Sequence, residues 1–470
     1  MIRDAHGLEM TAAAPAVAEG YDRALRELLH YGPDMLSAPQ DVLAEDPDCP
    51  MGNLLRAYQS LMAIEAGCLG EGRDLLDAFR ARVLEERLLP RERAHVRVAE
   101  ALAREDLLAA AKLLRELNRE YPRDALGLYL GHNLDYFTGD AHALRDRIAE
   151  ALPCWSADDA LYAPVLGMYA FGLEEMGDYD GAEEVGGEAL SLDPKDVWGL
   201  HAVVHTYEMR ARFGEGLELF DRRMGDWAEG NYFTVHNWWH YALFNLEAGN
   251  LDAVRRIYDE RLFLDPGKCV AVKMCDASAL LWRLLLDGVD EPERWRELAQ
   301  VWSALTGPPC YAFNDMHAVM AFVGNGDVDR ADGLIADRKR WLAEDHAGVT
   351  NYSMTANVGL PVCRALLAFG TGRYGDAVDQ LMPIRHQLNE FGGSHAQRDA
   401  VLRTLLEAAI RGRRYDVAEL VLGERITVKP GSPYNWLKRG ELARASGNED
   451  EAAGAEARAE ALVRASGLAA

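Results

Sequence analysis

The chain has 470 residues and a formal net charge of -26, because 76 acidic side chains face 50 basic ones. This charge would repel the phosphates of nucleic acids and anionic lipid headgroups, so we expect neither nucleic acid nor a membrane as a partner. Hydrophobic residues make up 49% of the chain and charged residues 27%, which is typical of a folded globular protein and excludes long disordered stretches.

Targeting and redox signals are weak. Residues 1–19 lack the apolar run of a signal peptide, and no later stretch is long and apolar enough to cross a bilayer. The seven cysteines include no Cys-x-x-Cys pair, which argues against a zinc ribbon or a disulfide framework. We therefore expect a cytoplasmic protein with reduced thiols.

A repeating helical pattern runs along most of the chain. An apolar helix ends near Gly-Asp, Gly-Asn or Gly-Arg, and a second, Ala-rich helix then runs to a proline. A clear copy extends from Tyr162 through Gly177-Asp178 to Asp193-Pro194, and its successor starts at Trp198 and turns at Arg212-Phe213-Gly214. Further turns are expected at Gly139-Asp140, Gly249-Asn250, Gly326-Asp327, Gly372-Arg373 and Arg413-Arg414.

The repeat length of roughly 36 residues is near that of tetratricopeptide repeats, whose helix pairs bury their apolar faces by stacking. The pattern thus predicts an all-α fold, a tetratricopeptide-type helical repeat superhelix (α-solenoid). We expect an N-terminal tail over residues 1–18, a single superhelix over 19–460 and a C-terminal tail over 461–470.

Most histidines fall on the first helix of a pair, the helix that lines the concave surface of such a superhelix. They are His95, His132, His201, His205, His236, His240 and His317, with His395 at the start of a later first helix. Two helices are dense, because His201, His205 and Glu208 form one stripe and His236 and His240 form an i, i+4 pair one repeat later. Neighbouring first helices run side by side, so we expect these side chains to face one volume.

Histidines and carboxylates on facing helices suit general acid–base chemistry, because a carboxylate orients an imidazole and tunes its pKa. The groups assigned to catalysis are His205, Glu208, His236, His240, Asp315 and His317. The tryptophans would wall the site, and Arg398 would anchor an anionic group. The groups assigned to substrate binding are Trp238, Trp239, Tyr207, Asp276, His201, His395, Gln397, Arg398 and Asp399.

Several alternatives stay open at this point. The same histidines and acids could hold a divalent metal, although the His-Glu-x-x-His motif is absent, so the metal and any cofactor are left unassigned. His205 could be a packing residue, Trp238-Trp239 a core pair, and Glu208 or Asp399 a helix-end hydrogen-bond partner. Against these simpler interpretations stands the cost of burying many polar groups that neither pair nor bind a ligand.

Several short sequence segments together resemble the family of tetratricopeptide repeat protein 38 and its bacterial relatives. The resemblance extends from about Tyr21 to about Arg439. The segments are residues 197–209, 236–240, 313–317, 359–363, 383–385, 392–394 and 397–399. The resemblance implies a one-domain helical repeat superhelix and no established reaction. It also implies motif positions at His205, Glu208, His236, Trp239, His240, Asp276, Asp315, His317, Gln397, Arg398 and Asp399. His395 stands where the family usually has Asn.

The leading hypothesis is an enzyme that acts on a small polar or amphipathic molecule in the groove by acid–base chemistry, with or without a metal. The alternative is a non-catalytic scaffold whose groove receives a peptide or partner protein. An enclosed site lined by groups of perturbed pKa would favour the enzyme, and an open groove would favour the scaffold. The oligomeric state is left open.

Overall fold

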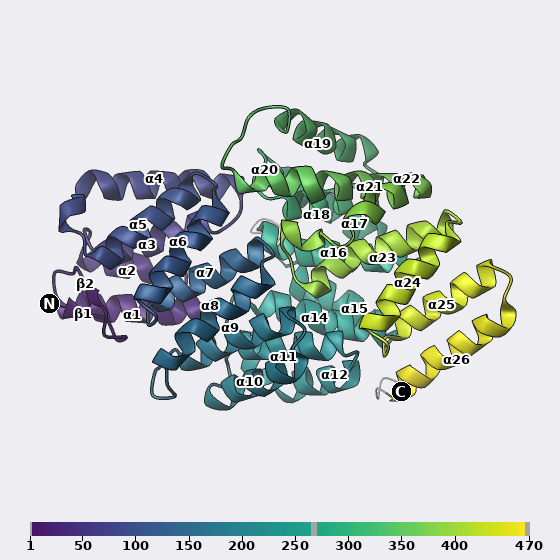
Figure 1. Cartoon of the computed structure of the whole chain (residues 1–470), viewed down its shortest axis with the longest axis horizontal. Coiled ribbons are helices and arrows are strands. Elements are labelled where there is room, and N and C mark those ends of the chain that lie inside the picture. The colour runs from purple at the N-terminus through teal and green to yellow at the C-terminus, as the bar shows by residue number, and fades with distance from the viewer. Residues whose placement is uncertain (1, 265–269, 466–470) are drawn as a thin grey trace.

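The computed structural model describes residues 2–264 and 270–465, and it is built almost wholly from helices that pair in antiparallel fashion (Figure 1). The chain is an all-α repeat protein of tetratricopeptide type, as the repeating pattern predicted. The first helices of the pairs are α1 (Pro15–Leu29), α3 (Pro50–Leu61), α5 (Pro90–Ala103), α7 (Ala125–Phe137), α9 (Tyr162–Glu175), α11 (Val197–Met209), α14 (Thr234–Glu247), α16 (Ala271–Leu286), α18 (Ala312–Gly324), α21 (Leu360–Gly370), α23 (His395–Arg411) and α25 (Pro433–Ala445).

The second helices pack against the first helices of their pairs. They are α2 (Ala38–Glu45), α4 (Ala66–Arg82), α6 (Leu107–Glu120), α8 (Ala141–Ala151), α10 (Tyr179–Leu192), α12 (Phe213–Arg222), α15 (Leu251–Ile257), α17 (Pro292–Leu305), α19 (Val328–Trp341), α22 (Tyr374–Leu381), α24 (Tyr415–Val428) and α26 (Glu449–Ala465). Two short helices, α13 (Met224–Trp227) and α20 (Thr350–Met354), extend the connections.

The turns inside the pairs follow the expected chemistry. Gly139, Gly177, Gly249, Gly326 and Gly372 each have a φ between 69° and 80°, a region that glycine enters without steric cost. In the pair α11–α12 the left-handed residue is instead Ala211, with a φ of 54°, and Phe213 already begins α12. The expected turn at Arg212-Phe213-Gly214 was therefore wrong in detail, since Gly214 lies inside the helix.

The N-terminal residues differ from the expected tail. Strands β1 (Ile2–Arg3) and β2 (Glu9–Met10) form an antiparallel hairpin, and α1 begins at Pro15. Asp4 in this hairpin is buried and forms an ion pair with Arg91 of α5 at 2.8 Å. At the other end α26 continues to Ala465, and residues 466–470 of the expected C-terminal tail lie outside the described residues.

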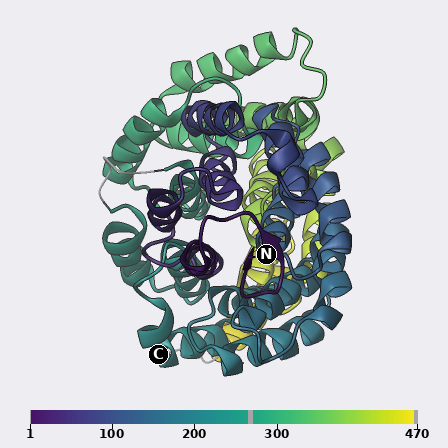
Figure 2. The same cartoon turned by 90° about the vertical axis from the view of Figure 1, so that its left-hand side faces the viewer.

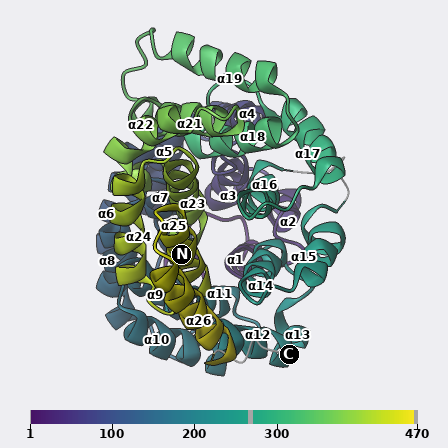
Figure 3. The same ribbon diagram turned by 90° about the vertical axis from the view of Figure 1, so that its right-hand side faces the viewer.

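The superhelix turns back on itself, and its N-terminal helices α1–α3 lie inside the ring formed by the later helices (Figures 2 and 3). Trp198 Nε1 of α11 donates to the Leu29 carbonyl at 2.8 Å, and Tyr232 N donates to the Tyr31 carbonyl at 2.7 Å. The turn after α3 also reaches α18, where Asn314 Nδ2 donates to the Ile64 carbonyl at 3.0 Å. The concave side of the stack is therefore covered by the chain's own helices.

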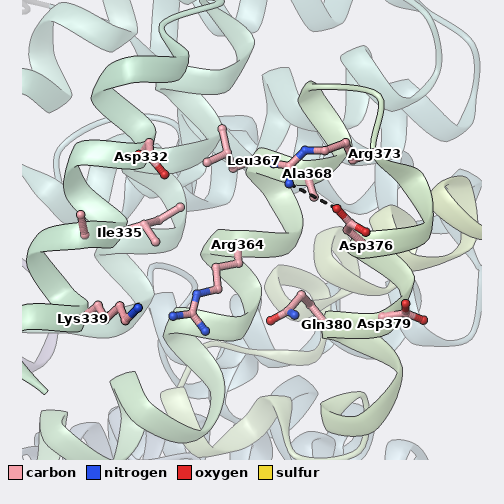
Figure 4. Close-up of a pocket in the computed structure, with 11 residues that line it drawn as sticks. Asp332, Ile335, Lys339, Arg364, Leu367, Ala368, Arg373, Asp376, Asp379 and Gln380 are labelled. Atoms are coloured by element: carbon pink, nitrogen blue, oxygen red, sulfur yellow. Dashed lines mark hydrogen bonds and ion pairs between the residues drawn. The ribbon is translucent and has the colours of Figure 1, made fainter. Parts of the chain in front are cut away.

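A large surface cavity lies on the outer side, away from this inner face. Its volume is about 520 Å³, and α19, α21 and α22 line it with residues that include Ile335, Lys339, Arg364 and Leu367 (Figure 4). Among the helices of the described residues, none has the length and apolarity that a bilayer-spanning segment needs.

Candidate functional site

Four imidazoles meet at one point between α11 and α14. His201 and His205 lie one turn apart on α11, and His236 and His240 lie one turn apart on α14, so each pair projects from one face of its helix. His236 Nε2 lies 3.2 Å from His201 Nε2 and 3.2 Å from His240 Nε2. The rings of His205 and His240 are 4.4 Å apart. The four rings offer nitrogens that all lie within 4.8 Å of one another, which confirms that these histidines converge.

Carboxylates face the outer nitrogens of three of these rings. Asp276 Oδ2 of α16 lies 2.9 Å from His236 Nδ1, and Glu208 Oε2 lies 3.2 Å from His240 Nδ1. Glu174 Oε2 of α9 lies 3.6 Å from His205 Nδ1. Metal-binding histidines commonly use such a carboxylate to fix the tautomer and orientation of the ring. His201 Nδ1 has no hydrogen-bond partner among the described residues.

The hydrogen bonds to Asp276 and Glu208 assign the protons on two rings. A carboxylate accepts, so Nδ1 of His236 and Nδ1 of His240 carry the hydrogens. The two Nε2 atoms lie 3.2 Å apart, and a ring whose single hydrogen is on Nδ1 presents a lone pair at Nε2. Direct contact of this kind is repulsive unless a positive charge lies between the two nitrogens.

Burial sets the charge state of the cluster. The described structure leaves no exposed surface on His205 and His240, whereas the His236 side chain keeps 18% of its surface exposed. Burial, followed by repulsion from the neighbouring imidazoles, lowers the pKa of His201, His205 and His240 well below the usual range. His201, His205 and His240 are therefore neutral near pH 7 and available as ligands.

A second polar group adjoins the first. Glu174 and Glu175 at the end of α9 face His395 at the start of α23, and these three residues offer atoms within 4.8 Å of one another. Burial raises the pKa of Glu174 to about 7. Burial opposes ionisation of Glu175 as well, but His395 and Arg398 outweigh it and lower the pKa of that carboxyl group. Glu174 touches both groups, because its two oxygens face His205 and His395.

Trp239 packs against the histidine cluster. Its ring stacks on His236 with centroids 5.3 Å apart and an interplanar angle of 18°, and it packs edge-on against His240. The guanidinium carbon of Arg283 of α16 lies over the Trp239 ring, 5.4 Å from its centroid. Trp239 is fully buried, so it excludes water from this side of the cluster.

Asp315 and His317, both assigned to catalysis, lie apart from the cluster on α18. Asp315 forms a two-pronged ion pair with Arg338 of α19, at 2.9 and 2.8 Å. His317 Nδ1 lies 2.8 Å from the Phe313 carbonyl of its own helix, and burial lowers its pKa to about 4. Their surroundings are those of a buried interhelical ion pair and a packing histidine.

Two of the aromatic residues assigned to substrate binding also have other neighbours. Trp238 packs against Trp227 with centroids 4.6 Å apart and donates from Nε1 to the Ala228 carbonyl. Tyr207 is half-buried beneath the guanidinium of Arg212, 4.3 Å from the ring centroid.

Three residues assigned to substrate binding, Gln397, Arg398 and Asp399, are paired with other groups of the protein. Arg398 binds Glu175 at 3.1 Å and the Gly393 carbonyl, so it is not a free anion anchor. Gln397 forms a capping box with Ser394 and accepts a hydrogen bond from Tyr136. Asp399 is held by two guanidinium groups, Arg425 at 2.6 Å and Arg403 at 2.8 Å. Although burial opposes it, this pairing keeps the pKa of Asp399 well below its usual range.

Sequence reasoning missed Glu174 and Glu175. The repeat itself carried a signal, because Glu174 stands three residues before the left-handed Gly177 and Glu208 stands three residues before the left-handed Ala211. Aligning successive repeats on their turns would have placed the two glutamates at the same end of neighbouring first helices.

No protein-family model matches the chain. Similar solved structures include the human IFIT1 dimer with PPP-AAAA, which is 12% identical over 98% of both chains with a TM-score of 0.36. They also include the Cut9–Hcn1 hetero-tetramer of APC/C, 12% identical over 96% of both chains with a TM-score of 0.32. The TPR domain of P58(IPK) is 13% identical over 80% of this chain and 96% of that one, with a TM-score of 0.22. At such identities and TM-scores, what these proteins bind has no bearing on this chain.

Proposed function

We propose that the chain is a metalloprotein that holds a divalent first-row cation among His201, His205, His236 and His240. The observation that carries the proposal is the His236–His240 contact, in which the two Nε2 atoms lie 3.2 Å apart while each Nδ1 faces a carboxylate. Burial lowers the pKa of His240 well below the usual range, which disfavours a proton held on that ring. A metal cation does not depend on protonating a buried ring.

The spacing of the nitrogens supports a shared ion. Two imidazole nitrogens bound to one tetrahedral ion at about 2.0–2.1 Å lie about 3.3 Å from each other. His236 Nε2 lies 3.2 Å from Nε2 of His201 and 3.2 Å from Nε2 of His240. Imidazole ligands suit zinc, copper, iron and nickel, and the acidic groups around the rings offset the charge of a divalent ion.

The carboxylates divide the four histidines into two kinds. His236 and His240 each form a hydrogen bond to a carboxylate through Nδ1. His205 Nδ1 lies 3.6 Å from Glu174 without a hydrogen bond, and His201 Nδ1 has no hydrogen-bond partner among the described residues. Three oriented histidines and a fourth, exchangeable position are characteristic of catalytic metal centres. We assign the three rings that lie beside a carboxylate as permanent ligands, and the position beside His201 as the place where water or a substrate oxygen binds.

A centre of this kind supplies Lewis-acid and acid–base chemistry to a small polar molecule, since a bound divalent ion lowers the pKa of water. In that chemistry Trp239 keeps one side of the centre dry. The covered concave side favours this enclosed centre over the peptide-binding scaffold, whose groove would have to be open.

Two further assignments are part of the proposal. Membership of the tetratricopeptide repeat protein 38 family is supported by the segments around His236–His240 and Gly392–Asp399. A cytoplasmic location is the other assignment, and the net charge of -26 supports a function away from nucleic acid and anionic membranes.

The test is metal binding by the purified full-length protein. After chelation and gel filtration, addition of Zn²⁺ or Co²⁺ should restore one tightly held equivalent, measured by elemental analysis. His236→Ala and His240→Ala should each lose it, whereas His142→Ala, which replaces an exposed histidine of α8, should retain it. Retention of the full equivalent by both cluster variants, or no retained metal in the unaltered protein, would overturn the proposal.

A further inference from the structure

Glu174 is the most unusual carboxylate among the described residues, because it is fully buried and neither oxygen has a hydrogen-bond partner there. Its neighbour Glu175 accepts two hydrogen bonds, from the His395 backbone N–H at 2.9 Å and from the Arg398 guanidinium at 3.1 Å. An ionised carboxylate left in this state costs several kcal/mol unless a positive charge comes close to it.

Two imidazole nitrogens lie near the oxygens of Glu174 but beyond hydrogen-bonding distance. His205 Nδ1 lies 3.6 Å from Oε2, and His395 Nδ1 lies 3.9 Å from Oε1. Both nitrogens lack a hydrogen-bond partner in the described structure. Charge-assisted hydrogen bonds close to about 2.7–2.9 Å, so these separations are too long for direct bonds.

The same separations are also too short for a bridging water. A water that hydrogen-bonds both groups at about 2.8 Å would hold them roughly 4.5 Å apart. Two donor atoms that share a cation at about 2.0–2.2 Å lie roughly 2.8–4.4 Å apart, depending on the angle at the ion. The 3.9 Å between His395 Nδ1 and Glu174 Oε1 falls in that range, and Glu174, Glu175 and His395 each offer one ligand atom within 4.8 Å of the others.

We propose that Glu174, Glu175 and His395 form a second divalent-cation site, distinct from the four-histidine centre and next to it. Glu174 connects the two, with one oxygen toward His205 and the other toward His395. A set of two carboxylates and one imidazole is richer in oxygen than the first centre, so it favours a harder ion such as Mn²⁺. His395 keeps 31% of its side-chain surface exposed, which gives this ion a route from solvent.

The test uses full-length protein loaded with one equivalent of Zn²⁺ and then titrated with Mn²⁺, with free Mn²⁺ followed by electron paramagnetic resonance. We expect one Mn²⁺ to bind per chain. His395→Ala and the isosteric Glu174→Gln should raise its dissociation constant at least tenfold, and His386→Ala, an exposed histidine before α23, should leave it unchanged. Circular dichroism and thermal melting show whether each variant is folded.

Two results would overturn the second site: no Mn²⁺ bound by the unaltered protein, or equal binding by folded His395→Ala and Glu174→Gln. Either would mean that an imidazolium of His395 bridges the two glutamates. Failure of the first proposal looks different, because His236→Ala would then leave Zn²⁺ binding unchanged whatever Mn²⁺ does. The two proposals therefore stand or fall separately.

Discussion

The four central histidines have unequal surroundings. Asp276 and Glu208 hold His236 and His240 by hydrogen bonds, and Glu174 faces His205 at a longer distance. His201 Nδ1 lacks such a partner in the described structure. Support by an outer carboxylate is worth 10–100-fold in metal affinity in known centres. The rings should therefore contribute unequally to binding.

Replacing His201 with alanine should weaken Zn²⁺ binding less than tenfold, because three oriented rings remain. Replacing Glu208 with glutamine, which leaves every ring in place, should weaken it 10–100-fold, because His240 loses its carboxylate. Competition with a chromophoric chelator measures both constants. Equal, complete loss of binding in His201→Ala and His240→Ala would show a closed four-histidine site instead of an exchangeable position.

Asp315 differs from the carboxylates beside the histidine cluster, because it forms a buried ion pair with Arg338. Asp315→Ala leaves that buried guanidinium without its main partner, so we expect a loss of about 3–5 kcal/mol in the free energy of unfolding. Metal content should not change. Asp332→Ala, an exposed position on α19, is the control and should shift stability by less than about 0.5 kcal/mol. Loss of metal without loss of stability in Asp315→Ala would contradict this interpretation.

The sequence predicted the histidine cluster better than the rest of the site. The i, i+4 spacing of His201 with His205 and of His236 with His240 fixes the face of each helix, and adjacent first helices bring those faces together. Asp315 and Arg398 could not be separated from functional groups in this way. Their partners, Arg338 and Glu175, lie on other helices at distances that only tertiary packing sets.

At the scale of the elements, the turn between the two helices of each pair needs one left-handed residue. Glycine fills this position at Gly372, whereas Arg413 occupies the equivalent position after α23 with a φ of 56°. The fold was predictable because a left-handed residue, most often glycine, marks the turn at a fixed place in the repeats. The hairpin of β1 and β2 was not predictable, because two strands of two residues carry no periodicity.

Exchanging the residue types at these two turns should move stability in opposite directions. Arg413→Gly relieves a left-handed conformation at an exposed side chain, so we expect a gain of about 1 kcal/mol. Gly372→Ala introduces the same strain at a site with open space for the methyl group, so we expect a loss of about 1 kcal/mol. Urea unfolding measures both, and a shift of the same sign in the two variants would contradict the account.

At the scale of the whole molecule, several histidines are buried as neutral rings, and this predicts sensitivity to acid. His132 is the simplest case, because its ring packs edge-on against Trp198 and burial lowers its pKa to about 3. In the unfolded chain its pKa returns to about 6.5, so below that pH the unfolded state binds more protons than the folded state. Stability therefore falls as the pH drops from about 6.5 toward about 3.

Replacing His132 with phenylalanine should remove this contribution. Between pH 7.5 and pH 5 the unaltered protein should lose up to about 2 kcal/mol more unfolding free energy than His132→Phe, at about 1.4 kcal/mol per pH unit. His142→Phe, which changes an exposed histidine, should follow the unaltered protein. Parallel pH profiles for the protein and His132→Phe would contradict the neutral assignment.

The covered concave side gives the whole molecule a closed interior, with the histidine cluster between α11 and α14 and the glutamates of α9 beside it. The most direct test of this account is X-ray absorption at the metal edge of the Zn²⁺-loaded, full-length protein. It should report three to four imidazole nitrogens at about 2.0–2.1 Å in the first shell. A first shell of oxygen alone, or one unchanged in His240→Ala, would contradict the four-histidine centre.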